Sequence, residues 1–180
     1  MRLFINILVL SSFVFCVDMI VKPYLQNGTN NSIVIMWETD GLSESVVEWG
    51  PSEESFIQSE GSSIISYGSN RIHTVELFNL SSYTRYYYRV LFDNEYSETF
   101  NFITPPEGNI DTQFKLVAMS DMQRDGSNPN KFNEIIHDGV IDYLSEEYSN
   151  DIAAELAMVL VTGDLVVTGS SYYQWQDHFF

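Results

Sequence analysis

The chain has 180 residues, of which 44% are hydrophobic and 14% aromatic, and its formal net charge is −17. This composition is typical of packed globular cores and argues against a disordered chain. Only 8 basic residues stand against 25 acidic ones. Nucleic acid and anionic membrane surfaces are therefore poor partners, because both are bound largely through Lys and Arg. The length allows one large domain or two small ones.

The first 16 residues have the pattern of an export signal. Arg2 precedes an apolar run over residues 3–17, which is shorter than the about 20 residues of a membrane span and has the length of a signal-peptide core. Val14 and Cys16 suit cleavage after residue 16, and a lipoprotein signal with Cys16 acylated is the alternative. We expect an exported protein, whether secreted, periplasmic or at the cell surface, with no stable membrane span. Cys16 is the only cysteine, so the mature chain holds no disulfide.

Residues 21–104 are predicted to form a β-sandwich. Short β-branched or aromatic stretches alternate with turn clusters such as residues 27–32, and no helical period intervenes. In residues 71–77 every second residue, from His73 to Leu77, lies on one face. This alternation predicts a strand with one apolar face and one solvent-exposed face. The predicted strands span residues 32–39, 45–50, 71–77, 85–92 and 97–104.

A change of pattern predicts a linker at residues 105–113, which contain two prolines and a glycine. Residues 114–119 and 157–162 are expected to be buried strands. Asn128 is the expected helix cap and Pro129 the first helical residue of the segment between them. Its apolar residues recur at helical spacing: Phe132, Ile135, Ile136, Val140 and Leu144. Strand, helix and strand predict a βαβ unit, so the fold class changes from all-β to α/β at the linker.

Asp121 and Asp164 follow the two strands of this predicted unit. Ligands of a parallel sheet bind beyond the carboxyl ends of its strands, and neighbouring strands lie about 4.8 Å apart. Two carboxylates at that spacing suit a pair of metal ions about 3.5–4 Å apart, and Gly163 lets the backbone come close to a metal. Either aspartate alone could instead cap a helix or close a turn. Their joint placement favours a metal site.

The stretch LSSYTRYYYRV at residues 80–90 resembles the tyrosine corner of fibronectin type III domains. The matching positions are Leu80, Thr84, Tyr86, Tyr88 and Val90. A tyrosine hydroxyl at such a corner ties the turn to the strand, and Trp37 stands where that fold buries a tryptophan. KPYLQNGTNNSIVIMWET resembles more narrowly the opening of the N-terminal domain of purple acid phosphatase-type proteins. The resemblance implies that residues 21–104 are a packing module with an aromatic core.

SDMQ, followed some forty residues later by GDLV, resembles the first two motifs of the metallophosphoesterase superfamily, which includes purple acid phosphatases. The resemblance implies that residues 114–180 begin an α/β domain of the four-layer αββα type and leave it incomplete. It also implies that Asp121 binds one metal and that Asp164 bridges both. Gln123 stands where many members have a histidine, and is a weaker ligand candidate through its carbonyl oxygen. Val167 stands where plant-type enzymes carry a tyrosinate. The identity of the metals is therefore left open among Fe, Zn, Mn and Mg.

These observations predict the N-terminal part of an exported acid phosphatase-like phosphoesterase, which cleaves phosphate esters with a metal-activated hydroxide. Arg124 is a candidate for contact with the substrate phosphate, and a solvated surface arginine is the alternative. We expect the chain to end before the superfamily's later histidine motifs and to be inactive by itself. His73, His137 and His178 are expected to be structural residues or surface residues, and no catalytic residue is assigned. The alternative is a non-catalytic cell-surface binding or spacer module with a vestigial hydrolase segment.

Overall fold

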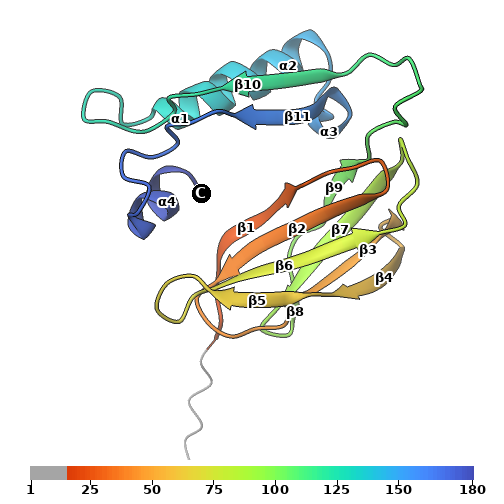
Figure 1. Ribbon diagram of the computed structural model, residues 1–180, viewed down its shortest axis with the longest axis horizontal. Coiled ribbons are helices and arrows are strands. Elements are labelled where there is room, and N and C mark those ends of the chain that lie inside the picture. Colours follow the sequence, from red (N-terminus) through yellow and green to blue (C-terminus); the bar gives the residue numbers. More distant parts are fainter. Residues whose placement is uncertain (1–15) are drawn as a thin grey trace, which may run out of the picture.

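The computed structural model describes residues 16–180, and its first part is a pair of antiparallel sheets (Figure 1). In one sheet the order is β1 (Met19–Gln26), β2 (Ser32–Thr39), β6 (Arg71–Phe78) and β5 (Ser62–Ile65). In the other it is β4 (Ser55–Glu60), β3 (Val46–Ser52), β7 (Arg85–Phe92) and β8 (Glu95–Tyr96), with β9 (Phe100–Ile103) also paired to β7. Buried side chains of both sheets form one core: Ile33, Ile35, Trp37, Val47, Trp49, Val75, Leu77, Leu80, Tyr86, Tyr88, Val90 and Phe102.

All five predicted strands exist in the sandwich. The predictions for residues 32–39 and 85–92 match β2 and β7, while β3, β6 and β9 differ from their predictions only at the ends. Four strands have no counterpart in the sequence prediction: β1, β4, β5 and β8. In β1 the misleading residue is Pro23, which cannot donate to a ladder. It is tolerated because β1 lies at the edge of its sheet.

The fibronectin-like features lie where the sequence places them. The hydroxyl of Tyr86 accepts a hydrogen bond of 2.9 Å from the backbone N–H of Ser81, which ties the corner to β7. Trp37 is fully buried, and its ring stacks on that of His73 with centroids 4.8 Å apart. His73, Val75 and Leu77 are buried while their neighbours along β6 are not, which confirms the predicted alternation.

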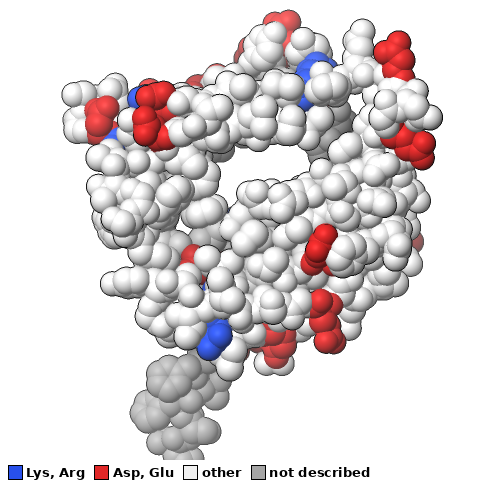
Figure 2. Space-filling model, viewed as in Figure 1, with Lys and Arg blue, Asp and Glu red and all other residues white. Residues whose placement is uncertain are grey.

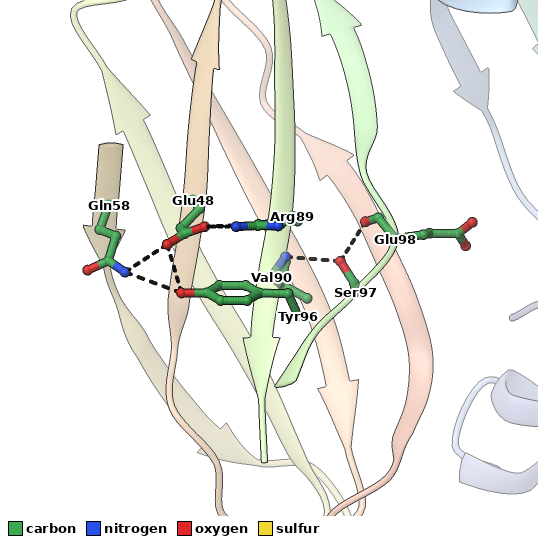
Figure 3. Close-up of polar contacts among 7 residues, drawn as sticks. All are labelled: Glu48, Gln58, Arg89, Val90, Tyr96, Ser97 and Glu98. Carbon is green, nitrogen blue, oxygen red and sulfur yellow. Dashed lines mark hydrogen bonds and ion pairs between the residues drawn. The ribbon is translucent and has the colours of Figure 1, made fainter. Parts of the chain in front are cut away.

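A polar cluster crosses four strands of the second sheet (Figure 3). The guanidinium of Arg89 donates to one carboxylate oxygen of Glu48 at 2.9 and 2.6 Å. The other oxygen accepts from the hydroxyl of Tyr96 at 2.7 Å and from the amide of Gln58 at 3.0 Å. Cross-strand pairs of this kind stabilise a sheet. This cluster lies within the sandwich.

After the linker, β10 (Lys115–Met119) and β11 (Leu156–Val161) pair in parallel. The chain between them forms α1 (Lys131–Asn133), η1 (Glu134–Ile141), α2 (Asp142–Glu147) and α3 (Ile152–Glu155), and α4 (Tyr172–His178) follows β11. The two predicted strands and the helix between them are therefore present. The middle of that helix, η1, is a π-helix, and Gly139 within it is a weak α-helix former. None of the helices in residues 16–180 has the length and apolarity needed to cross a bilayer.

Two expectations for this second part are wrong. The helix begins at Lys131, with no side-chain cap, and not at Asn128 and Pro129. Instead, the carboxylate of Asp125 accepts the backbone N–H groups of Ser127 at 2.7 Å and Asn128 at 2.9 Å. This local turn uses the Asn128 donor and delays the helix.

The second wrong expectation is that both strands are buried. Most of β11 is exposed, with Met158, Val159 and Leu160 between 42% and 48% accessible. Within residues 16–180 each of the two strands has only the other as a neighbour. An apolar strand is buried only when further strands or helices cover it.

Candidate metal centre at the carboxyl ends of the strand pair

The loops that follow β10 and β11 run side by side. The backbone N–H of Asp121 donates to the carbonyl of Gly163 at 3.2 Å, and the N–H of Gln123 donates to the carbonyl of Asp164 at 3.0 Å. One step earlier, the N–H of Thr162 donates to the carbonyl of Met119 at 3.1 Å. The parallel ladder thus continues past the ends of the strands. It brings the backbones of the two predicted ligands to one edge of the strand pair.

Asp121 and Asp164 share an uncommon backbone conformation. Their φ angles are +58° and +52°, in the left-handed region that residues other than Gly, Asn and Asp rarely enter. Five other described non-glycine residues with this conformation lie in turns of the sandwich: Asn27, Asn79, Tyr83, Asp93 and Asn94. The conformation therefore indicates a tight turn in each of the two adjacent loops.

The carboxylates of both aspartates lie at the surface. One oxygen of Asp121 accepts a 2.6 Å hydrogen bond from the hydroxyl of Ser120. Neither aspartate serves as a helix cap, since the residues before the helices of the described chain make no capping side-chain bond. Both carboxylates are therefore accessible to an ion from solvent.

Two apolar residues that the sequence analysis overlooked anchor these loops. Met122 is 1% exposed and Val166 is 8% exposed. Each lies within two residues of a predicted ligand, so the loop backbones are fixed by packing. The available signal was the single apolar residue set among polar neighbours at Met122.

Gln123 offers a test of whether the loops suit a metal ion. Its carbonyl oxygen Oε1 is buried and has no hydrogen-bond partner. A buried acceptor without a partner costs about 1–3 kcal/mol. A hard cation would satisfy it, since glutamine oxygens are ligands for such ions. The donor types in the two loops, two exposed carboxylates and this carbonyl oxygen, are those that a hard cation prefers.

Arg124 lies in the loop after β10 and lines a hollow. One guanidinium nitrogen donates to the backbone carbonyl of Asp177 at 2.7 Å. The residue borders a pocket of about 210 Å³ between the loop after β10 and the end of α4. His178 borders the same pocket, and its Nδ1 is buried without a hydrogen-bond partner. Arg124 is the pocket's lining residue nearest in sequence to Asp121.

The other histidines lie away from the aspartates. His73 is fully buried in the sandwich, with hydrogen bonds to the hydroxyls of Thr39 at 2.8 Å and Ser45 at 2.9 Å. His137 is exposed on η1. In residues 16–180 no three or more His, Cys, Asp or Glu side chains gather in a group that could hold a metal. The structure thus brings together the Asp121 and Asp164 loops, while His178 lines the pocket beside Arg124.

Comparisons with known proteins concern mainly the sandwich. Residues 20–104 match the family described as the N-terminal domain of purple acid phosphatase. Two structures of the sensor domain of the anti-sigma factor RsgI4 of Pseudobacteroides cellulosolvens are each 16% identical. The longer form covers 55% of this chain and 99% of its own, with a TM-score of 0.41, and the shorter form covers 52% and 99%, with 0.40. A redesigned β-sandwich protein is 19% identical. The match covers 48% of this chain and 93% of that protein, with a TM-score of 0.35. Curated protein sequences give no match.

Proposed function

We propose that this protein, whose residues 20–104 form a purple acid phosphatase-like N-terminal domain, is a metal-dependent phosphoesterase. The family match supports a phosphatase that acts on phosphate esters. The observation that carries the metal site is the pair of backbone hydrogen bonds between the loops of Asp121 and Asp164. In this proposal residues 114–180 begin the metallophosphoesterase domain.

The residues of the two loops would hold the metal ions. Asp121 would bind one ion, Asp164 would bridge two, and the carbonyl of Gln123 would bind through an oxygen that has no other partner. When bound, such ions neutralise charge on phosphate oxygens and lower the pKa of water. Among Fe, Zn, Mn and Mg, carboxylate and carbonyl oxygens suit Mn and Mg best.

Arg124 would contribute a positive charge next to the metal ligands. The chain is strongly acidic, with 25 acidic and 8 basic residues, so a phosphate ester approaches it against repulsion. The guanidinium of Arg124, three residues from Asp121, offsets this electrostatic repulsion locally. Its planar shape also matches the geometry of phosphate oxygens. Its hydrogen bond to the Asp177 carbonyl holds the side chain in place.

Export is part of the same proposal. It rests on the signal-like residues 1–16, of which residues 1–15 lie outside the described part of the chain. Cys16 is exposed, as a cleavage site or an acylation site must be. Mass spectrometry of the mature N-terminus distinguishes cleavage after residue 16 from acylation of Cys16.

A hydrolysis assay tests the activity. The product of the whole reading frame is expected to hydrolyse p-nitrophenyl phosphate, and a chelator is expected to abolish turnover. Asp164→Asn should lower kcat by at least about 100-fold, because a ligand shared by two ions is lost. Activity that survives both chelation and Asp164→Asn would refute the metal mechanism. A correctly folded whole protein without activity at any of the four metals would favour the non-catalytic module.

A further inference from the structure

One carboxylate of the sandwich accepts hydrogen bonds from the short helix after β11. Glu38 of β2 accepts the hydroxyl of Tyr172 at 2.8 Å on one oxygen and the side-chain amide of Gln176 at 2.6 Å on the other. The hydroxyl of Ser66 also donates to Glu38. These partners lie up to 138 residues away in sequence. Glu38 is therefore the junction between α4 and the first sheet.

The burial of Glu38 results from this attachment. Ile33, Ile35 and Trp37 are the core-facing residues of β2, so the alternation of a strand directs Glu38 to the outer face. A glutamate there is expected to be solvated, yet Glu38 is only 4% exposed. The side chains of α4 that donate to it supply the cover.

Aromatic contacts extend the junction on both sides. The ring of Tyr172 stacks on that of Tyr67, with centroids 4.7 Å apart and planes 11° apart. The amide of Asn70 donates to the Tyr172 hydroxyl at 2.7 Å. At the end of the chain, Phe180 packs against Tyr24 of β1 with centroids 5.2 Å apart. Partial burial raises the pKa of the Tyr172 hydroxyl above its ordinary value of 10, so at neutral pH the hydroxyl is protonated and donates to Glu38.

A second attachment lies at the other end of the strand pair. Arg85 of β7 donates to both carboxylate oxygens of Asp151, at 3.2 and 2.6 Å, just before α3. Figure 1 shows the strand pair lying across the sandwich, with the linker at one side and α4 at the other. Figure 2 shows an opening between these two parts. The strand pair is thus held at its two ends, and only the α4 attachment lies on the side of the candidate metal loops.

We propose that Glu38 is a positioning residue, through which the sandwich holds the loop of Asp164 in place. This loop ends where α4 begins. In the loop, the backbone N–H of Thr168 donates to the side-chain oxygen Oε1 of Gln174 in α4 at 2.7 Å. A buried carboxylate is tolerated only while it is hydrogen bonded, so the contact favours one placement of α4. The inference rests on the proposed function only in its naming of Asp164 as a metal ligand.

Amide hydrogen exchange on the metal-free 180-residue chain tests this proposal. Glu38→Ala, Tyr172→Phe and Gln176→Ala each remove one part of the junction, and Glu48→Gln is the matched control, because Glu48 bonds only within the sandwich. We expect exchange in residues 162–180 to rise about tenfold or more in the first three variants, as for the loss of a hydrogen bond to a charged group. The control should leave that segment unchanged.

The reporters of positioning are the amides of Asp121, Gln123 and Thr162, which bridge the two loops. Their exchange should rise with that of α4, while strands β2, β3 and β7 stay protected. Faster exchange confined to residues 172–180 would overturn the proposal, and so would exchange equal to that of the wild type. If Glu38→Ala does not fold, Tyr172→Phe decides, since it removes one hydroxyl outside the sandwich. Failure to bind metal would refute the proposed function and leave this result standing.

Discussion

The backbone N–H of Gln123 lies 3.0 Å from the carbonyl oxygen of Asp164. Together with the hydrogen bond from the Asp121 N–H to the Gly163 carbonyl, this contact joins the loop that follows β10 to the one that follows β11, although the two segments are far apart in sequence. It places the backbones of Gln123 and Asp164 at the same edge of the strand pair. The first two predictions depend on this relationship.

Binding of Mn²⁺ should require both aspartates. We expect the 180-residue chain to bind Mn²⁺, with the affinity lowered at least about tenfold by Asp121→Asn and by Asp164→Asn, because each removes a charged oxygen ligand. Titration calorimetry measures the affinity. The matched control is Asp138→Asn, an exposed aspartate on η1, which should bind as the wild type does. Equal affinity in all four proteins would contradict the assignment.

Gln123→Met should change stability and metal binding in opposite directions. Without metal the buried oxygen has no partner, so an apolar side chain of similar shape should leave the free energy of unfolding unchanged or raise it by about 1 kcal/mol. The same substitution should weaken Mn²⁺ binding. Urea unfolding in chelator and titration calorimetry give the two values. A clear loss of stability without metal would show that the Gln123 oxygen has a partner.

Acid should destabilise the sandwich through His73. Burial is the main cause that lowers the pKa of His73, to about 4 from an ordinary value of 6.5. Above pH 6.5 the imidazole of His73 is neutral in both the folded and the unfolded chain. As the pH falls from 6.5 to 4 the unfolded chain binds a proton that the folded chain does not, so about 3 kcal/mol of stability is lost. Below pH 4 this loss stops growing.

Urea unfolding of the wild type between pH 7 and 4 checks this expectation. His73→Phe should remove most of this pH dependence, because Phe keeps a planar ring against Trp37 without a titrating group. His137→Asn is the control, since His137 is exposed. A wild-type stability that stays flat from pH 6.5 to 4 would show that His73 titrates normally.

Gly61 should not tolerate a side chain. The chain passes there from β4 in one sheet to β5 in the other, and a Cβ atom at Gly61 would collide with the backbone of Thr74 and Val75. Backbone cannot move aside cheaply, so Gly61→Ala should lower the free energy of unfolding by about 1–3 kcal/mol or more. Gly108→Ala, in open space in the linker, should change it by less than about 0.5 kcal/mol. Equal stabilities would refute the close approach.

The 180-residue chain should unfold in two steps in urea. The sandwich has a closed aromatic core, whereas the strand pair exposes most of β11. An open pair with free edges is marginally stable, so residues 114–180 should unfold at lower urea than the sandwich. Circular dichroism and the fluorescence of Trp175, compared with that of Trp37 and Trp49, separate the steps. A single transition with a slope suited to the whole chain would contradict this.

Much of the sandwich could be predicted because its signals are local. The alternation around His73 and Leu77 and the tyrosine corner at Tyr86 are set by neighbours along the chain, and the structure confirms both. β1 was unpredictable from such signals, since Pro23 is tolerated only at a sheet edge and the edge is defined by strand order. The helix start near Asn128 failed for a related reason: Asp125 competes for the same backbone donors.

For the candidate site, the sequence by itself determined which residues follow the two strands, because strand period and turn chemistry depend on residues close together in the chain. That Asp121 and Asp164 belong to a metal site remains a prediction. Only the tertiary structure decided that their loops are hydrogen bonded, that both backbones are left-handed and that the Gln123 oxygen has no partner. It also decided that Glu38 is buried, because the hydroxyl that covers it comes from 134 residues away. The burial of a polar residue on the outer face of a strand depends on what packs against it across space, and the local pattern around Glu38 does not record it.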